Sequence, residues 1–133
     1  MSQENVQVVR RSLEAFGRND WEAALAECDP GIEWIEMPSL GPDASTYRGT
    51  AEVRVALESW IAMWSEYDLE VCRYADVADE VVLLVRERGS GDTSGAGAER
   101  EVGDVFTVRG GKIIRARLYG SWSEALEAAG LSE

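Results

Sequence analysis

The sequence predicts an α+β protein in which helices gather on one face of a curved, mainly antiparallel sheet. Three observations lead to this prediction. Helical patterns dominate the first half of the chain, strand patterns follow one another in the second half, and the Gly110-Gly111 pair between the last two strands is typical of a two-residue hairpin. With 133 residues and 45% apolar content, residues 1–133 are expected to form one compact domain with its own core.

The first part of the chain predicts two helices. Apolar side chains recur at helical spacing over residues 3–17, and Ser12 lies on the same face as them. A second, short helix is expected at about residues 20–28. The sequence Asp29-Pro30-Gly31 strongly favours a turn and is expected to end that helix.

A strand and a third helix are expected next. Residues 32–37 read as a strand that Pro38 ends, and Glu36 shares one face of it with large apolar groups. Residues 38–49 have the composition of a loop. Thr50 is the expected N-cap of a helix over about residues 51–66, the most apolar helix of the chain.

Four further strands and a terminal helix complete the prediction. The strands are expected at about residues 68–76, 80–88, 100–109 and 112–120. Residues 89–98 are rich in Gly and Ser, which is typical of a mobile hairpin loop. The sequence Ser121-Trp122-Ser123-Glu124 has the pattern of a capping box and predicts a short C-terminal helix.

The charge balance excludes several classes of function. The chain has 13 Lys and Arg, 25 Asp and Glu and no His, so its formal net charge is −12. Without His there is no Ser-His-Asp or Cys-His nucleophile pair, no imidazole base and no His-ligated metal. The acidity argues against nucleic acid and anionic membranes as partners.

Neither a membrane-spanning run nor a secretory leader is recognisable, so a cytoplasmic protein is expected. Cys28 and Cys72 are expected to be buried free thiols, with a disulfide between them as the alternative.

Four stretches of the chain carry a resemblance to a known family. They are Val8-Val9-Arg10-Arg11-Ser12-Leu13-Glu14-Ala15-Phe16-Gly17-Arg18-Asn19-Asp20, Asp29-Pro30-Gly31-Ile32-Glu33-Trp34-Ile35-Glu36-Met37-Pro38, Tyr47-Arg48-Gly49, and Asp104-Val105-Phe106-Thr107-Val108-Arg109-Gly110-Gly111-Lys112-Ile113-Ile114. In order and spacing they resemble the nuclear transport factor 2-like superfamily, and within it the SnoaL-like and ketosteroid-isomerase-like proteins. The resemblance implies a cone-shaped sheet wrapped around three helices, a pocket opening into the cone, and a homodimer through the outer sheet surface. The superfamily hosts isomerases, cyclases, hydrolases, dehydratases and binding proteins, so the fold alone does not give a function.

Three residues match the isomerase-like site by position. The resemblance implies that Glu36 is the general base, that Asp104 donates a hydrogen bond to an oxyanion, and that Ser12 occupies the place of the oxyanion-hole tyrosine. The match at Glu36 needs a one-residue gap. A serine hydroxyl is shorter and far less acidic than a phenol, which counts against steroid isomerase activity.

The residues themselves support a role for the two acids and also allow others. Asp104 alternates with Val102 and Phe106, and an acid in an apolar row should have a raised pKa. A shift of register by one residue would turn it to solvent instead. An ion pair with a neighbouring Arg is the other alternative, and the candidate partners are Arg86, Arg115 and Arg117. Glu36 is either a partly desolvated base or an ordinary carboxylate at a strand end, and Ser12 either contacts the ligand or packs between helices.

The remaining pocket walls are expected to be aromatic. Candidates are Phe16, Trp34, Trp60, Trp64 and Phe106. For Trp64 and Trp21 a place in the core is favoured over contact with a ligand, and Trp34 and Trp60 are open to either. Arg115 and Arg117 fit either a dimer interface or cross-strand pairs with Glu. We expect no cofactor and no metal. The sequence thus favours a protein that binds a small hydrophobic molecule and acts on it by acid–base chemistry. The alternative is a non-catalytic binding or dimerisation module of the same fold.

Overall fold

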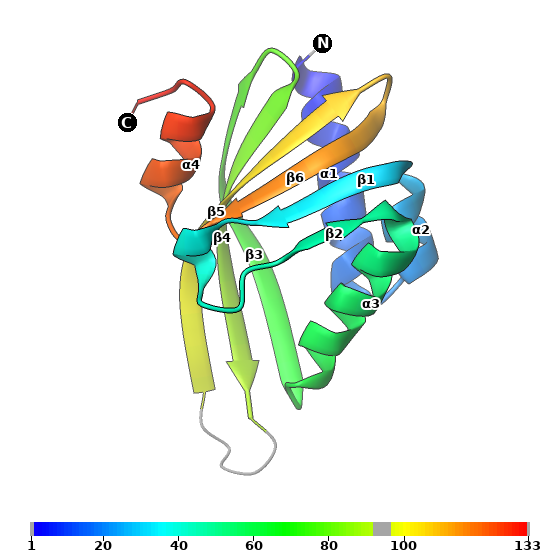
Figure 1. Cartoon of the computed structure of the whole chain (residues 1–133), viewed down its shortest axis with the longest axis vertical. Coiled ribbons are helices and arrows are strands. Elements are labelled where there is room, and N and C mark those ends of the chain that lie inside the picture. The colour runs from blue at the N-terminus through cyan, green and yellow to red at the C-terminus, as the bar shows by residue number, and fades with distance from the viewer. Residues whose placement is uncertain (1, 92–96, 133) are drawn as a thin grey trace.

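The computed structural model describes residues 2–91 and 97–132, and its sheet is strongly curved (Figure 1). In chain order the elements are α1 (Ser2–Gly17), α2 (Trp21–Ala26), β1 (Cys28–Glu36), the 3-10 helix η1 (Pro38–Leu40), β2 (Thr46–Arg48), α3 (Gly49–Ala62), β3 (Glu66–Val77), β4 (Glu80–Ser90), β5 (Gly97–Arg109), β6 (Lys112–Tyr119) and α4 (Trp122–Ala128). The six strands form one sheet in the order β2-β1-β6-β5-β4-β3. Only the β1–β6 pair is parallel among the strand pairs described, so the predicted α+β class with a mainly antiparallel sheet is confirmed.

The helices do not all lie on one face of the sheet, which corrects the sequence prediction. Helices α1 and α3 bury Val9 and Val53 against the concave face, whereas α4 packs Trp122 on the opposite side, against Val82 and Val105 (Figure 1). The physical reason is the continuous apolar run at the start of β4, residues 81–85, which makes both faces of that strand apolar. A strand of this kind needs cover on both faces, and α4 provides the outer cover.

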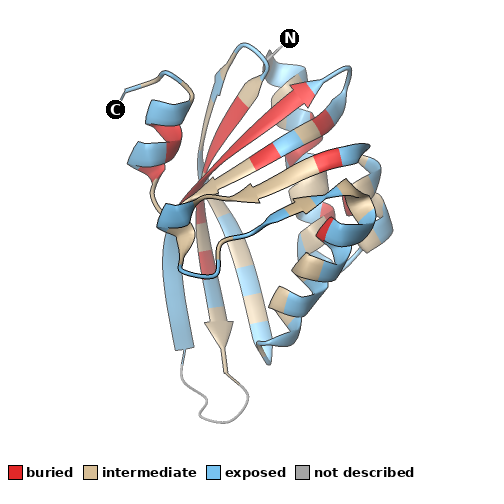
Figure 2. Ribbon diagram, viewed as in Figure 1, coloured by how far each residue is buried: buried red, intermediate tan, exposed pale blue. Residues whose placement is uncertain are grey.

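Burial is unevenly distributed along the sheet. In Figure 2 the buried segments gather in the upper half of the strands and on α4, while the lower ends of β3, β4 and β5 are mostly intermediate or exposed. The core therefore closes one end of the curved sheet. The other end is left for the cavity described below.

The predicted boundary between the second helix and the first strand is wrong. Helix α2 ends at Ala26, and β1 already begins at Cys28, which pairs with Ile113 of β6. The Asp29-Pro30-Gly31 segment lies in an irregularity of register between Cys28 and Glu33. Pairing with β6 thus overrides the local turn signal, because a bulge accommodates residues that cannot join the ladder. The expected loop over 38–49 also contains η1 and β2, which were not predicted.

The start of the third helix also differs from its prediction. The helix begins at Gly49 and ends at Ala62, and its N-cap is Arg48 rather than Thr50. No side chain of the cap residue bonds to the helix; instead the Glu52 carboxylate accepts a hydrogen bond from the Arg48 backbone N–H at 2.9 Å. This contact is similar to one half of a capping box, but the carboxylate comes from the fourth helical residue instead of the third.

The hairpin and the terminal helix agree with their predictions. Gly110 and Gly111 both have positive φ, at 60° and 77°, as a type I′ turn requires. Ser121 caps α4 by accepting a hydrogen bond from the Glu124 N–H. The loop predicted over 89–98 is shorter, since β4 reaches Ser90 and β5 starts at Gly97, and residues 92–96 lie outside the described part of the chain.

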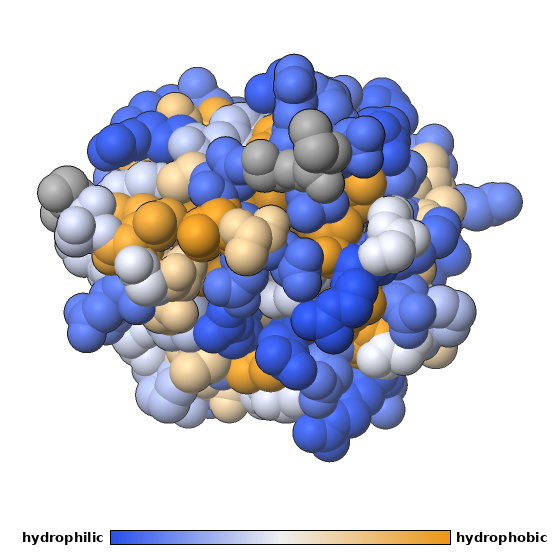
Figure 3. Space-filling view, turned by 90° about the horizontal axis from the view of Figure 1, so that it is seen from above, coloured by the Kyte–Doolittle hydropathy of each residue, from blue (hydrophilic) through white to orange (hydrophobic). Residues whose placement is uncertain are grey.

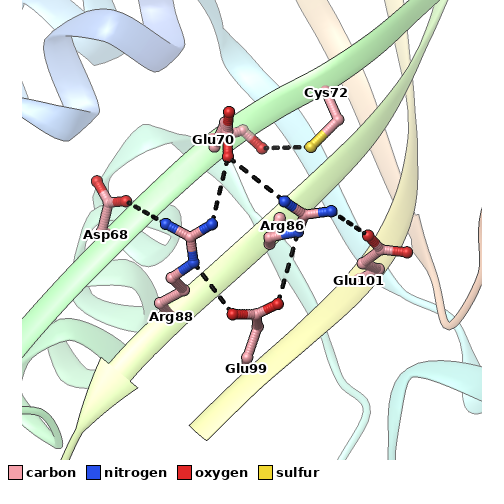
Figure 4. Close-up of polar contacts among 7 residues, drawn as sticks. All are labelled: Asp68, Glu70, Cys72, Arg86, Arg88, Glu99 and Glu101. Atoms are coloured by element: carbon pink, nitrogen blue, oxygen red, sulfur yellow. Dashed lines mark hydrogen bonds and ion pairs between the residues drawn. The ribbon is translucent and has the colours of Figure 1, made fainter. Parts of the chain in front are cut away.

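Charged side chains cover the outer face of the β3–β4–β5 arm. Arg86 and Arg88 point to the same side of β4 and share carboxylates from the strands on either side (Figure 4). Their partners are Asp68, Glu70, Glu99 and Glu101, at nitrogen–oxygen distances of 2.9–4.0 Å. These pairs are exposed, so each contributes little stability. The network nevertheless keeps this face polar.

Other features of the outer surface bear on the sequence predictions. Arg115 pairs with Glu33 and Arg117 with Glu80, so the cross-strand alternative for these arginines is confirmed. Both cysteines are free, but Cys72 is exposed rather than buried. Viewed from the end that carries both termini, the surface is largely hydrophilic with apolar groups between charged ones (Figure 3). Among the described residues, no helix is long and apolar enough to cross a membrane.

Candidate ligand-binding cavity

A cavity of about 490 Å³ lies between the concave face of the sheet and the three helices α1, α2 and α3. Its lining includes seven residues that the sequence predicted for the site: Ser12, Phe16, Trp34, Glu36, Trp60, Asp104 and Phe106. The exposed residues Pro42 and Met63 also line it, so the cavity reaches the surface beside α3. Trp64, for which a place in the core was favoured over ligand contact, is not part of this lining, and its indole packs over Gly89.

Asp104 lies in the apolar row of β5 that faces the cavity. It is opposite Leu83 of β4 and Leu118 of β6, and Val102 and Phe106 flank it on the same face. The residue is 6% exposed, and its Oδ1 atom has no hydrogen-bond partner in the part of the chain that the structure describes. Burial raises the pKa of Asp104 to about 8; the negative charge of Glu87 adds to this, and Arg100 opposes it. At neutral pH the side chain is therefore mainly a neutral acid with an O–H to donate.

No arginine pairs with Asp104, which removes the alternative of a structural ion pair. Arg86 bonds to Glu101 at 2.9 Å on the outer face. Arg115 and Arg117 are engaged by Glu33 and Glu80, as described above. The register of β5 between β4 and β6 thus turns Asp104 inward and these arginines outward.

Glu36 is the last residue of β1 and lies in the same row of the sheet. Leu118 of β6 is opposite both Glu36 and Asp104, so two inter-strand spacings, roughly 10 Å, separate the two backbones. The Oε1 atom of Glu36 accepts a hydrogen bond from the Ser45 N–H at 3.1 Å. The second carboxylate oxygen is therefore left for other contacts, and the residue is partly exposed.

Ser12 is committed to helix packing. Its hydroxyl donates to the Ala24 carbonyl oxygen at 2.8 Å and so ties α1 to α2. A hydroxyl has one proton to donate, so Ser12 cannot also donate to a ligand while this bond holds. Nearby, burial raises the pKa of the Cys28 thiol to about 11, which keeps it a neutral, apolar part of the wall.

Aromatic rings form much of the wall. Trp34 and Phe106 lie side by side with ring centroids 6.0 Å apart, and Phe16 and Trp21 meet edge to face at 5.5 Å. Flat apolar surfaces of this kind suit a flat apolar ligand. Trp21, expected only as core, is also part of the lining.

A second polar group in the cavity was missed by the sequence analysis. Glu87 of β4 is 9% exposed; it accepts hydrogen bonds from the Tyr67 hydroxyl and, at 2.9 Å, from Arg100 Nε. The Arg100 guanidinium also lies 4.9 Å over the Trp60 ring. One signal was present in the sequence, since Glu87 continues the alternating row of Leu83 and Val85. Its partners come from other strands and become neighbours only through register.

The fold and cavity can now be compared with known proteins. A family model for the SnoaL-like domain matches residues 9–116. The chain belongs to the SnoaL-like domain family. This confirms the family resemblance seen in the sequence. None of the curated proteins matches this SnoaL-like chain.

Solved structures show the same fold across nearly the whole chain. An NTF2-like protein of unknown function from Burkholderia pseudomallei is 25% identical, with a TM-score of 0.77 over 96% of this chain and 97% of that one. A putative SnoaL-like polyketide cyclase from Jannaschia is 19% identical, with a TM-score of 0.74 over 89% and 85%. TerC, co-crystallised with polyporic acid, is 21% identical, with a TM-score of 0.78 over 89% and 92%. At 19% and 21% identity, the Jannaschia protein and TerC show that the fold is shared and no more.

The cavity of this SnoaL-like domain combines a mainly apolar lining with a few ionisable side chains. In residues 2–91 and 97–132 no group of three or more Cys, Asp and Glu side chains is arranged to hold a metal ion. The acidic and basic side chains among the described lining residues are the neutral acid Asp104, the acidic residues Glu36 and Asp43, and the Arg100–Glu87 pair. Such groups recognise oxygen atoms on an otherwise apolar molecule.

Proposed function

We propose that this SnoaL-like domain binds a small, uncharged, mainly apolar carbonyl compound and moves a proton next to its carbonyl group. The observation that carries the proposal is the unpartnered carboxyl of Asp104 inside an aromatic cavity. A buried polar atom without a partner is costly, and a carbonyl oxygen that accepts from the Asp104 O–H would supply the missing bond.

The proposed chemistry divides the work between two acids. When a base removes a proton from the carbon beside a carbonyl, negative charge moves to the oxygen, where a neutral acid stabilises it by donating a hydrogen bond. Asp104 is the donor in this proposal. Glu36 is the base, because it keeps one carboxylate oxygen free, whereas both oxygens of Glu87 are occupied by hydrogen bonds from Tyr67 and Arg100.

A simple aromatic ketone tests both roles. With 2-acetylnaphthalene in D₂O, proton NMR measures the exchange of the acetyl protons for deuterium. The wild-type protein should accelerate exchange over buffer, and Asp104→Leu and Glu36→Gln should each reduce the acceleration by at least about tenfold. Glu33→Gln is the matched control, since Glu33 lies on the same strand but pairs with Arg48 and Arg115 on the outside.

Binding is measured on the same samples by quenching of tryptophan fluorescence. Asp104→Leu should lower the affinity for 2-acetylnaphthalene by about tenfold. Its affinity for 2-ethylnaphthalene, which has no oxygen, should stay within about twofold of that of the wild type. Binding without accelerated exchange in the wild type would favour the alternative of a non-catalytic binding module. Absence of binding would overturn the proposal altogether.

The affinity for a ketone should also depend on pH. Burial raises the pKa of Asp104 to about 8, so the side chain loses its donor proton above that pH. The Kd for 2-acetylnaphthalene should be constant between pH 6 and 7 and rise by about tenfold for each unit of pH well above the pKa. The Kd for 2-ethylnaphthalene should stay flat, and a parallel rise for both ligands would contradict the assignment.

A further inference from the structure

We propose that Arg100 and Glu87 form a second recognition site in the cavity, one that binds a hydroxyl group at the far end of the ligand from its carbonyl. This inference rests on the proposed function, and it narrows the substrate class. The ligand would be an elongated, uncharged aromatic or polycyclic molecule with an oxygen at each end: a carbonyl at Asp104 and a hydroxyl at the arginine–glutamate pair.

The position of the pair sets the shape of the ligand. Arg100 is opposite Glu87 in the β4–β5 register, and Asp104 is opposite Leu83, four residues further along β4. Four residues of strand span about 13 Å, and both groups face the same cavity. The charge of Glu87 raises the pKa of Asp104 and that of Arg100 lowers it. A ligand touching both sites must therefore be elongated along the strands.

The contacts of Arg100 leave it free to donate. Its Nε atom holds Glu87, and its guanidinium lies over the Trp60 ring. The two terminal nitrogens donate to no acceptor among the described residues. Arg100 is also the one cationic side chain among the described residues that line the cavity. Arg100 lines the cavity with a side chain that is 40% exposed. Stacking on the indole keeps the guanidinium plane in place, so its terminal N–H groups are available to a ligand.

The charge of the pair selects a neutral group. Glu87 neutralises Arg100, Asp104 is mainly uncharged at neutral pH, and the whole chain carries a formal charge of −12. A carboxylate would meet no net positive charge in this cavity. A hydroxyl fits better, because its oxygen accepts from Arg100 while its proton goes to a second lone pair of the Glu87 carboxylate. An ether or a hydrocarbon makes fewer of these bonds or none.

A pair of ligands that differ by one hydroxyl tests the inference. The probes are 6-hydroxy-2-acetylnaphthalene, with oxygens at both ends, and 2-acetylnaphthalene, with the carbonyl alone. The wild type should bind the hydroxyl compound at least about fivefold more tightly. Arg100→Met keeps an apolar stem over Trp60 but has no donors. In this variant the affinities for the two ligands should become equal within about twofold.

Arg88→Met is the matched control. Arg88 is on the same β4–β5 arm and is ion-paired in a similar way with Glu99, but it lies on the outer face (Figure 4). The Arg88→Met variant should still bind 6-hydroxy-2-acetylnaphthalene more tightly than 2-acetylnaphthalene. Equal affinity of the wild type for both ligands, or a preference that survives in Arg100→Met, would overturn the second site while leaving the carbonyl site at Asp104 intact. Failure of both ligands to bind would overturn the proposed function as well.

Discussion

Replacing Asp104 with Asn should flatten the dependence of stability on pH. In the folded protein the pKa of Asp104 is raised from 3.8 to about 8, chiefly because the carboxyl is buried. The native state therefore holds a proton that the unfolded chain releases. The stabilisation from that proton is complete below about pH 4 and is lost as the pH rises toward 8, at no more than about 1.4 kcal/mol per unit.

The measurement is urea unfolding of wild type and Asp104→Asn at several pH values. Between pH 5 and 7 the stability of the variant should gain roughly 2–3 kcal/mol relative to wild type, since Asn does not ionise. Glu14→Gln, a change of the same charge on the exposed face of α1, should follow wild type at all pH values. If all three proteins show parallel profiles, Asp104 is ionised and hydrated in the folded state, and the carbonyl site fails.

Gly103→Ala should be among the most destabilising single substitutions on the sheet. A Cβ at this position would lie 2.4 Å from the Ser121 carbonyl oxygen and 2.7 Å from the Ala125 Cβ. Both atoms belong to the start of α4, which covers the outer face of β4 and β5. Relief of the clash requires α4 to move off Val82 and Val105, so we expect a loss of about 2–4 kcal/mol in the free energy of unfolding.

Gly97→Ala is the control for this substitution. It makes the same change on the same strand, and its Cβ would approach only the Gly89 carbonyl oxygen, at 4.0 Å. Its stability in urea should stay within about 0.5 kcal/mol of wild type. Equal stability of the two variants would show that α4 does not press on Gly103, and the outer position of this helix would need revision.

The carbonyl site was accessible from the sequence because it depends on local periodicity. Alternation along one strand places Asp104 between Val102 and Phe106, and the same rule puts Glu36 on a face with Trp34. A strand has two faces, however, and the periodicity does not say which one meets the helices. Pairing of β5 between β4 and β6 decided that Asp104 points into the cavity, and it sent the candidate partners Arg86, Arg115 and Arg117 outward.

Other features depended on contacts between distant segments. Tyr67, Glu87 and Arg100 meet because β3, β4 and β5 pair in one register, and the chain separates them by 13 residues or more. The early start of β1 at Cys28 followed from its pairing with β6, against a local turn signal. The Ser12 hydroxyl was bound by a backbone carbonyl of the next helix. Contacts of this kind between distant segments produce no periodic pattern of residue types, so they could not be predicted from the sequence.

Sequence alone determined the types of the α-helices and of the longer strands, the mainly antiparallel order and the family, but not η1 or β2. Each of the determined features depends on residues close together in the chain or on a pattern spread over its length. Tertiary structure decided which side of the sheet α4 covers and which acid stays without a partner. It also decided that an arginine and a glutamate share a cavity with Asp104. The physical reason is that burial and desolvation are properties of the packed molecule, set by register across strands rather than by neighbours along the chain.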